Sequence, residues 1–328
     1  MEKTSWMVIV NPKAGLGYGL RDWPAISNQL NKSGVEFTCV FTEKKYHAVE
    51  LAVKAVNDGY RKIVAIGGDG TVNEIVNGIF IQKKVPTTDI FLAVIPVGTG
   101  NDWVRMYGIP RYYSEAVKAI VECRTVCQDV GIITYNETLI THKRYMANVA
   151  GIGFDAIANR YFNRMKDEGR KGRGLYIIGV LKALLKYKSK RFKITVDGKL
   201  FFDDYMFNAS IGIGPYNGGG MKPMPAAIFD DGLLDITIVK KINKLWVMKS
   251  FRKLYNGKIY THPKVLASQG KHIEIESFPP SPIEIDGEAL GFSPFIFDVV
   301  PCSITVVVSK KFIANLDQDC QDERMKNK

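Results

Sequence analysis

The sequence predicts an α/β plus all-β protein, with an N-terminal α/β domain built on a parallel sheet and a C-terminal, mostly antiparallel β-sandwich domain. The chain has 328 residues, and this length favours two domains of roughly 100 to 200 residues each. Up to residue 128, short apolar strands alternate with helical segments, which favours parallel pairing with helices on both faces of a sheet. From residue 129 onward, strand-like runs alternate apolar and polar residues. We therefore expect one domain over residues 1–128 and a second over residues 129–308. The tail, 309–328, is polar, so we expect it either to lack fixed structure or to form a short helix on the first domain.

The first domain is expected to present its ligand site at one edge of the sheet. Its expected strands lie at 6–10, 36–42, 62–66 and 91–96, and its expected helices at 23–32, 47–57, 71–80 and 114–122. Ligands of such sheets bind beyond the carboxyl ends of the strands. Three of these strands are followed by turns of small or polar residues, namely NPKAG at 11–15, GGDGT at 67–71 and VGTGND at 97–102. We expect the three turns to line one cleft.

The second domain is expected to consist mainly of strands. Seven runs show period-two alternation with turn residues between them, at 145–154, 191–198, 199–214, 233–240, 271–277, 281–290 and 303–309. Two basic helical stretches interrupt these runs. This pattern of short alternating strands separated by turns predicts mostly antiparallel pairing.

The GGDGT turn carries an acid at a place where a phosphate-binding loop would carry a base. Glycine N–H groups, the Thr71 hydroxyl and the start of a helix can hold phosphate oxygens. A P-loop would add a lysine, whereas Asp69 would repel the phosphates unless a divalent cation lies between them, because Mg²⁺ joins protein carboxylates to nucleotide phosphates. Asp69 therefore predicts Mg²⁺ together with a nucleoside triphosphate. The alternative is a plain βα turn in which Asp69 caps the helix.

The net charge of +12 is concentrated in two stretches of the second domain. Residues 164–193 contain eleven Lys or Arg and two acids, and residues 240–258 contain seven Lys or Arg and no acid. Both stretches also carry large apolar side chains, and this mixture suits an anionic membrane surface. The alternative is two amphipathic helices packed on a core, with solvated lysines outside. Nucleic acid is disfavoured because no nucleic-acid-binding module is recognisable.

The chain is expected to stay in the cytoplasm. Its N-terminal apolar stretch runs straight into a turn, and no stretch reaches the ~18 uncharged apolar residues that a membrane span needs. The five cysteines form no CxxC pair, and their odd number suits a reducing compartment better than a disulfide framework. Cys123 and Cys127 are four apart, so we expect two buried thiols on one face of a helix rather than a zinc site.

Five motifs occur in an order and spacing that are together highly specific, although each alone is weak. The first three read NPKAG, GGDGTVNE and IPVGTGND, and the last two read GGGMKPMPAAIFDDGLLDI and IEIDGE. In these motifs the sequence resembles the soluble diacylglycerol kinase family, which includes bacterial lipid kinases, eukaryotic diacylglycerol kinase catalytic domains and sphingosine kinases. The resemblance covers about residues 6 to 310.

The resemblance implies that ATP binds to the turns of the first domain. The positions that match the family's nucleotide contacts are Asn11, Pro12, Lys13, Ala14, Gly15, Thr42, Gly67, Gly68, Asp69, Gly70, Thr71, Val72, Asn73 and Thr99. Asp69 then matches the aspartate that contacts the active-site Mg²⁺ through water, which agrees with the electrostatic argument above.

The resemblance also implies the acceptor side of the reaction. The DDGLLD stretch resembles a structural Mg²⁺ site that uses the Asp231 side chain and the main-chain carbonyls of Ile228 and Leu233. The DGE motif supplies a carboxylate general base, which matches Glu288, with Asp286 as the less favoured candidate. A plain hairpin turn is the alternative, because the chain contains a second Asp-Gly in ITVDGKLF for which no chemistry is claimed.

These observations predict a kinase that transfers the γ-phosphoryl group of ATP, with Mg²⁺, to a hydroxyl of diacylglycerol or a related membrane lipid. We expect peripheral contact with the anionic inner face of a membrane. A kinase resembling NAD kinase, and an inactive regulator that binds lipid or nucleotide, are the alternatives. The choice of lipid and the oligomeric state, including a homodimer, stay open.

Overall fold

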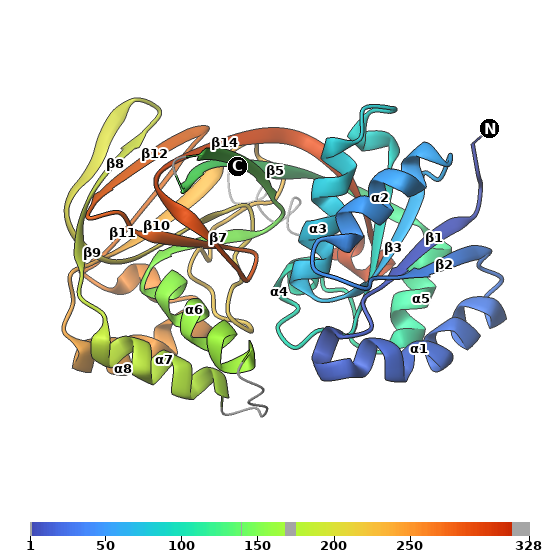
Figure 1. The fold of residues 1–328 in the computed structure, drawn as a ribbon, viewed down its shortest axis with the longest axis horizontal. Coiled ribbons are helices and arrows are strands. Elements are labelled where there is room, and N and C mark those ends of the chain that lie inside the picture. The colour runs from blue at the N-terminus through green and yellow to red at the C-terminus, as the bar shows by residue number, and fades with distance from the viewer. Residues whose placement is uncertain (1, 139, 168–174, 317–328) are drawn as a thin grey trace, which may run out of the picture. The chain divides into compact units, whose positions relative to one another are not determined.

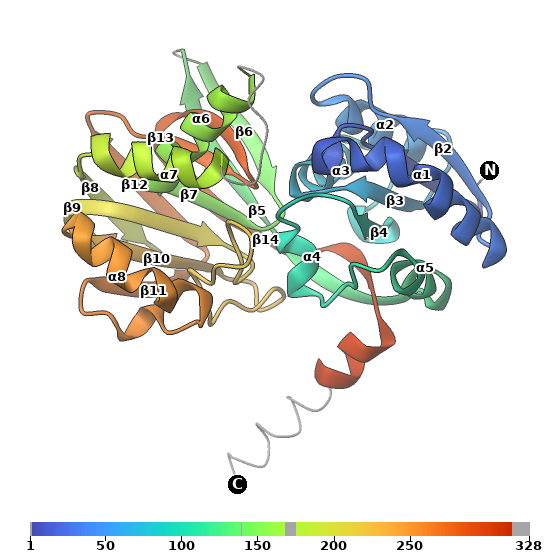
Figure 2. The ribbon, with the colours of Figure 1, turned by 90° about the horizontal axis from the view of Figure 1, so that it is seen from below.

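The computed structural model describes residues 2–138, 140–167 and 175–316. The chain folds into two compact units. The first unit comprises residues 1–128 and 302–328, and the second comprises residues 129–301. Figures 1 and 2 show the helices and strands of both units.

The first unit contains a parallel sheet of five strands in the order β2-β1-β3-β4-β14. Its strands are β1 (Trp6–Val10), β2 (Phe37–Phe41), β3 (Lys62–Gly67), β4 (Phe91–Pro96) and the end of β14 (Glu288–Val308). Its helices are α1 (Ala14–Lys32), α2 (His47–Asn57), α3 (Asp69–Ile81), α4 (Asp102–Met106) and α5 (Tyr113–Glu122), with a short 3₁₀ turn η1 (Thr87–Asp89) before β4. These bounds agree with the expected elements except that α1 begins nine residues earlier and α4 was not expected.

Helices cover both faces of this sheet (Figure 1). Helices α1 and α5 lie on one face, where Ile26 and Leu30 of α1 join Val8, Val64 and Ile95 of the strands in one buried cluster. Helices α2 and α3 pack against each other on the other face. A sheet covered on both faces needs strands that are apolar throughout, and all five residues of β1 are buried.

The sequence placed residues 302–308 in the second domain, and the structure corrects this. The end of β14 is the fifth strand of the parallel sheet, where Thr305 pairs with Phe91 and Val306 with Leu92 of β4. An apolar strand such as ITVVV fits a sheet covered on both faces as well as it fits a sandwich, so its composition could not decide between them.

The cysteine prediction was wrong, because neither residue is a buried thiol on a helix. Cys123 follows the last residue of α5 as a half-buried free thiol, but Cys127 lies in β5 (Arg124–Glu137) and forms a disulfide with Cys302. The two positions are 175 residues apart in sequence and meet because the chain leaves the first unit beside one of them and re-enters it at the other. Helix α5 ends at Glu122, before either cysteine, so the spacing of four residues does not place the two thiols on one helix face.

The second unit is β-rich, and its strands pair antiparallel. Its strands are β5, β6 (Ile140–Met146), β7 (Val149–Gly153), β8 (Lys190–Val196), β9 (Lys199–Gly212), β10 (Leu234–Lys240), β11 (Val265–Gly270), β12 (His272–Phe278), β13 (Pro282–Ile285) and the first part of β14. The pairing runs β7-β9-β8-β12-β14-β13 and returns to β7, and β10 and β11 extend it from β9. Most of β5, β6 and β11 was not expected, because polar residues occupy many of their positions.

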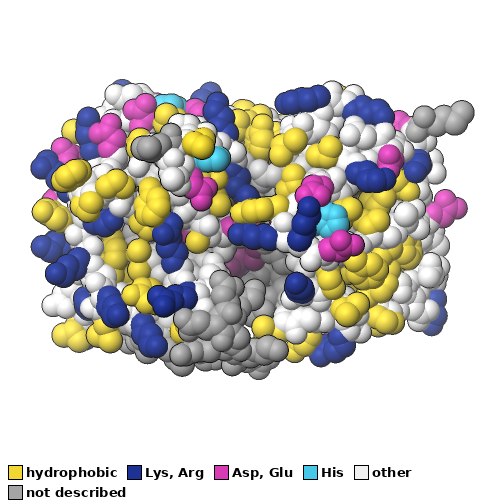
Figure 3. Space-filling model, in the orientation of Figure 1, with side chains coloured by type: hydrophobic (Ala, Val, Ile, Leu, Met, Phe, Trp, Pro, Cys, Tyr) yellow, Lys and Arg dark blue, Asp and Glu magenta, His cyan; other side chains and the backbone are white. Residues whose placement is uncertain are grey.

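Three helices cover one side of these strands (Figure 2). They are α6 (Phe154–Asp167), α7 (Leu175–Lys186) and α8 (Lys244–Tyr255), and a 3₁₀ turn η2 (Ile259–Thr261) follows α8. Phe154 of α6, Leu184 of α7 and Phe207 of β9 share one buried cluster, and Val247 of α8 packs against it. Figure 3 shows Lys and Arg mixed with hydrophobic side chains over α7 and α8. Part of the first basic stretch, residues 168–174, lies outside the described residues.

None of the helices within the described ranges is long and apolar enough to cross a membrane.

Candidate functional site

The three turns that follow β1, β3 and β4 come together in the first unit. A Cβ on Gly15 would lie 1.9 Å from the Val97 carbonyl oxygen, so the first turn touches the third through backbone atoms. A Cβ on Gly98 would lie 2.5 Å from the Gly68 Cα, so the third turn touches the second in the same way. Only glycine allows backbones to approach this closely, which explains the glycines in all three motifs.

Hydrogen bonds join the same turns. The Asn11 side-chain amide donates to the Thr71 hydroxyl at 3.0 Å, and the Asn11 side-chain oxygen accepts the N–H of Lys13 at 3.0 Å. Thr42 follows β2 and donates its N–H to the Val10 carbonyl at 2.8 Å, at the same edge of the sheet. The structure thus gathers the first and second turns and Thr42 as the sequence predicts, and Thr99 is exposed on the third turn.

Other predicted nucleotide contacts have buried side chains. Val72 and Asn73 lie in the first turns of α3 and are buried. Glu74, which ends the GGDGTVNE motif, accepts the N–H groups of Tyr46 and Ala48 at 3.1 Å each and so caps the start of α2.

Asp69 lies beside a second carboxylate. Its Oδ1 accepts the N–H of Trp103 at 2.9 Å, which fixes the side chain against the start of α4. Its Oδ2 and the Oδ2 of Asp102 lie 3.1 and 3.6 Å from the position that a Cβ on Gly100 would take. Burial raises the pKa of Asp69, and the neighbouring charge of Asp102 raises it further, against the opposing hydrogen bond from Trp103.

These residues fit a divalent cation. Two carboxylate oxygens converge on one space beside Gly100, and a dication would remove the repulsion between them. The side-chain oxygen of Asn101 is buried next to Gly98 and has no hydrogen-bond partner among the described residues, so it is one more oxygen available within the turn. The sequence argument missed Asp102, although the electrostatic reasoning applied to Asp69 would have found it in VGTGND.

The second unit holds the other predicted catalytic residue. Glu288 begins β14, and its Oε2 lies 3.3 Å from Nη2 of Arg144 on β6, with both side chains largely buried. Arg144 was missed because it is 144 residues away in sequence. The ion pair fixes the direction of the Glu288 carboxylate.

Asp286 has a structural role. Its carboxylate accepts the N–H groups of Ala147, Asn148 and Val149 at 2.8, 3.0 and 2.9 Å. A carboxylate that accepts three backbone N–H groups is held in place and is poorly suited to take up a proton. The geometry therefore favours Glu288 over Asp286 as a general base.

The predicted structural metal site is a tight loop before β10. The Asp231 carboxylate accepts the N–H of Leu233 at 3.0 Å, and Asp129 accepts the N–H of Gly232 at 2.6 Å. Burial raises the pKa of Asp230, and the charges of Asp129 and Asp231 add to this effect. The loop is thus rich in carboxylates, which suits a hard cation. In the described ranges no group of three or more Asp, Glu, His or Cys side chains is arranged to hold a metal, so an ion here would also need the main-chain carbonyls of residues such as Ile228.

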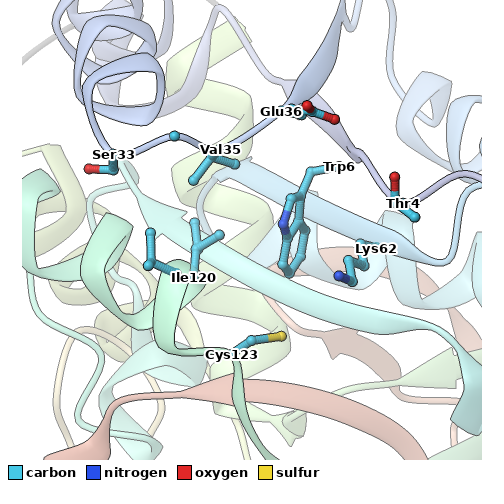
Figure 4. A pocket seen from close by; sticks show the side chains of 10 residues that line it. Thr4, Trp6, Ser33, Val35, Glu36, Lys62, Ile120 and Cys123 are labelled. Carbon is cyan, nitrogen blue, oxygen red and sulfur yellow. The ribbon is translucent and has the colours of Figure 1, made fainter.

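A pocket of about 290 Å³ lies at the opposite edge of the parallel sheet (Figure 4). Trp6, Val35 and Ile120 form its apolar wall, and Glu36 and Lys62 lie at its rim. The strands begin at this edge, whereas the three glycine turns follow their ends. The pocket contains none of the predicted nucleotide contacts.

Comparisons with known proteins match both halves of the chain. Residues 5–133 match the diacylglycerol kinase catalytic domain, and residues 148–308 match the YegS C-terminal NAD kinase beta sandwich-like domain. The diacylglycerol kinase of Staphylococcus carnosus strain TM300 is 30% identical over 290 residues, which cover 88% of this chain and 90% of that relative. The chain belongs to the diacylglycerol kinase family. The resemblance in the motifs is thereby confirmed, as is an α/β domain followed by a β-rich domain.

Further relatives agree with this membership. The diacylglycerol kinase of Staphylococcus aureus strain JH9 is 31% identical over 290 residues, which cover 88% of each chain. A solved structure of a candidate diacylglycerol kinase from Bacillus anthracis str. Sterne covers 94% of this chain and 98% of its own, with a TM-score of 0.72 and 26% identity. Yeast NADH kinase complexed with NADH covers 93% of this chain and 84% of its own, with a TM-score of 0.52 and 10% identity, a likeness in fold alone.

Proposed function

We propose that this member of the family transfers the γ-phosphoryl group of ATP, with Mg²⁺, to a hydroxyl of diacylglycerol or a related membrane lipid. The observation that carries the proposal is the pair of carboxylates, Asp69 and Asp102, set among three glycine turns. Glycine turns supply N–H groups for phosphate oxygens, and a dication can join these two carboxylates to the phosphates. The names of the relatives support diacylglycerol as the acceptor.

In the first unit, the proposed role of the turns is to hold and orient ATP. The start of α3 offers its first backbone N–H groups and its dipole, and residues 11–15 and 97–99 lie beside it. Asp69 and Asp102 would hold Mg²⁺, directly or through water, and the ion would neutralise phosphate charge as it develops during transfer. Trp103 holds the Asp69 carboxylate through its N–H, so the acid needs little reorganisation when the ion binds.

In the second unit, the proposed general base is Glu288. The lipid hydroxyl must lose its proton as its oxygen attacks the γ-phosphorus, and the Glu288 carboxylate can accept that proton. Arg144 donates to Oε2 of this carboxylate and orients it. The Asp231 loop is proposed to hold a second, structural Mg²⁺ through Asp231 and the carbonyls of Ile228 and Leu233.

The lipid acceptor requires contact with a membrane, and α7 and α8 offer a surface for it. Leu185, Leu245 and Trp246 are 75%, 72% and 56% exposed. Lys244 donates from its ammonium to the Leu185 carbonyl at 2.6 Å, which brings the end of α7 next to the start of α8. Exposed Leu and Trp beside lysines suit an anionic bilayer. We propose a cytoplasmic protein that binds the inner membrane face peripherally.

The decisive experiment supplies γ-labelled ATP and a total lipid extract to the purified protein and separates the labelled products by thin-layer chromatography. We expect one labelled lipid that depends on Mg²⁺ and is absent with the Asp69→Asn variant. NAD supplied in a parallel reaction tests the alternative of an NAD kinase. Label in NADP with none in any lipid would contradict the proposal.

A further inference from the structure

Glu284 is a buried acid that contacts the turn carrying Glu288. It lies on β13, and its Oε2 accepts the N–H of Gly287 at 3.1 Å. The side-chain amide of Asn159 on α6 donates to the same oxygen at 3.2 Å and to the Gly287 carbonyl at 2.9 Å. Glu284 and Asn159 therefore hold Gly287, the residue immediately before Glu288, from two sides.

The same unit contains a second turn of the same kind without these contacts. Asp286-Gly287 and Asp197-Gly198 both have positive φ at both residues, 48° and 87° in the first and 49° and 76° in the second. Each joins its strands as a two-residue hairpin loop, with Ile285 paired to Glu288 and Val196 paired to Lys199.

The aspartates of both turns also have similar roles. Asp197 accepts the N–H groups of Lys271 and His272 at 2.9 Å each, as Asp286 accepts three backbone N–H groups. At the position of Glu284, however, the second turn has Thr195, whose hydroxyl donates to Glu274. An Asp-Gly turn therefore forms without a buried acid, so hairpin formation does not account for Glu284.

Helix α6 also contacts the strand on the far side of Glu288. The Arg160 guanidinium donates to the Leu290 carbonyl at 2.6 Å and lies 4.7 Å from the ring centre of Phe292. The residues on both sides of Glu288 are thus tied to one helix, through Gly287 by Asn159 and through Leu290 by Arg160. The position of the Glu288 backbone is set by α6 rather than by the hairpin alone.

We propose that Glu284 and Asn159 are positioning residues that fix the Gly287 backbone and thereby the Glu288 carboxylate for proton transfer. The proposal rests on the proposed function, in which Glu288 accepts the proton of the lipid hydroxyl. Glu284 acts through the turn and does not touch the reacting atoms. Positional errors of about 1 Å at a catalytic group lower rates by up to about 100-fold, so a clamp of this kind has a kinetic consequence.

Burial, more than the neighbouring charges, favours the protonated form of Glu284 at neutral pH. Burial raises its pKa to about 8, and the charges of Asp155 on α6 and Asp286 in the turn add to this, whereas hydrogen bonds from Asn217 and Gly287 oppose it. Burial also raises the pKa of Asp155 to about 6, and Tyr187, the residue after α7, lies close to Asp155. Above about pH 8 an ionised Glu284 repels the carboxylates of Asp155 and Asp286. This repulsion acts against the hydrogen bonds that Glu284 accepts from Gly287 and Asn159, and it should displace the turn.

The test measures kcat and KM for ATP between pH 6 and 9.5 for the parental protein and three variants. We expect the parental kcat to fall above about pH 8, since a carboxylate base such as Glu288 by itself gives only an acidic limb. Glu284→Gln should keep the neutral-pH kcat and lose this fall, because the amide mimics the protonated acid. Asn159→Ala should lower kcat by about 10-fold at every pH with KM for ATP unchanged. The matched control Thr195→Ala, in the second Asp-Gly turn, should behave as the parental protein.

Two outcomes would overturn the positioning role. One is an alkaline fall in Glu284→Gln equal to the parental fall, and the other is an unchanged kcat in Asn159→Ala. Melting temperatures across the same pH range provide a readout without any substrate. The folded-state pKa of Glu284 is raised, so parental stability should decline relative to Glu284→Gln as the pH rises from about 5 to 8. If no lipid is phosphorylated, the proposed function fails, and this melting-temperature difference still decides whether the acid is held protonated against the turn.

Discussion

The ionised form of the Asp69 carboxyl is disfavoured in the folded protein. This carboxyl is desolvated next to Asp102, and its pKa is raised by burial and by that charge. Because the folded-state pKa is above the ordinary value, the ionised group lowers stability as the pH rises from the acidic range towards neutrality. Strain of this kind at a functional site is expected where a ligand supplies the missing charge.

We predict that Asp69→Asn loses activity and gains stability. The amide oxygen can still accept the Trp103 N–H, but it neither repels Asp102 nor holds a dication. Activity should fall by at least about 100-fold, and the melting temperature at pH 7 without Mg²⁺ should equal or exceed the parental value. The measurements are labelled-lipid formation and thermal unfolding, with the exposed Asp58→Asn as control. A variant that is less stable than the parental protein would contradict the electrostatic account.

The parental protein should also bind Mg²⁺ more tightly as the pH rises from the acidic range towards neutrality. Protons compete for Asp69 because its pKa is raised, so metal binding should release protons. Titration calorimetry in buffers with different ionisation enthalpies measures that release directly. Equal heats in the two buffers would show that no proton leaves.

The residues of the site differ in how far sequence could predict them. Asp69 was predictable because an acid inside a glycine turn conflicts with its surroundings, and that conflict is local in sequence. Arg144 and Glu284 were not, because their significance depends on contacts with β14 and α6 that only the folded chain brings together. The preference for Glu288 over Asp286 likewise depends on three N–H groups from residues 147–149.

The ion pair of Arg144 and Glu288 leads to a second prediction at this scale. Glu288→Gln should lower kcat by about 100-fold to 10,000-fold, as expected for loss of a general base. Arg144→Gln should lower kcat by about 10-fold with KM for ATP unchanged, because the carboxylate remains but loses its orientation. The control is Arg191→Gln, which removes an exposed ion pair with Asp203. An Arg144→Gln variant with parental kcat would show that the ion pair does not orient the base.

At the scale of elements, the three turns act as one unit because their backbones touch. Gly15 and Gly17 both have positive φ, 61° and 99°, near the start of α1. A Cβ on Gly15 would overlap the Val97 carbonyl oxygen, whereas a Cβ on Gly17 would meet no atom within 4 Å. Comparing alanine substitutions at Gly15 and Gly17 therefore distinguishes the effect of backbone strain from the effect of contact between the first and third turns.

We predict that Gly15→Ala weakens ATP binding far more than Gly17→Ala. Both variants carry the cost of alanine at positive φ, about 1 kcal/mol, but only Gly15→Ala forces the first and third turns apart. Binding of ATP, measured by the rise in melting temperature at saturating nucleotide, should be nearly lost in Gly15→Ala and retained in Gly17→Ala. Equal losses in both variants would mean that strain alone matters.

The elements themselves were predicted where their composition is distinctive. The helices at 47–57 and 114–122 matched closely because their apolar periodicity and flanking residues are clear. Strand β11 was missed since its sequence, VLASQG, is held by pairing with β10 rather than by propensity. The end of β14 was assigned to the wrong domain, because strand composition does not tell which sheet receives a strand.

At the scale of the whole molecule, the positive charge is concentrated while the acids are dispersed. No Asp or Glu occurs within 175–193 or 240–258, the stretches that contain α7 and α8. Lys182, Lys186 and Lys249 are exposed on these helices. The sequence predicted this concentration, but it could not say which apolar side chains would be buried. Leu184 and Val247 pack inward, whereas their neighbours Leu185 and Trp246 are exposed.

This arrangement predicts membrane binding with two separable contributions. Vesicles containing phosphatidylglycerol should bind the protein, and raising the salt from about 10 to 150 mM should weaken binding because the Debye length falls from about 30 to 8 Å.

Leu245→Ala with Trp246→Ala should weaken binding at both salt concentrations by about 10-fold or more, since each side chain contributes about 1.5 to 3 kcal/mol when buried in lipid. Lys244→Gln with Lys249→Gln should reduce mainly the salt-dependent part, at about 1 kcal/mol per charge. Leu200→Ala, an exposed leucine on β9, is the matched control and should bind as the parental protein does.

Both double variants should phosphorylate lipid in detergent micelles at the parental rate, because α8 carries none of the proposed catalytic residues. Equal binding to vesicles of phosphatidylcholine alone, or parental affinity in the Leu245 and Trp246 variant, would show that this surface does not meet the bilayer.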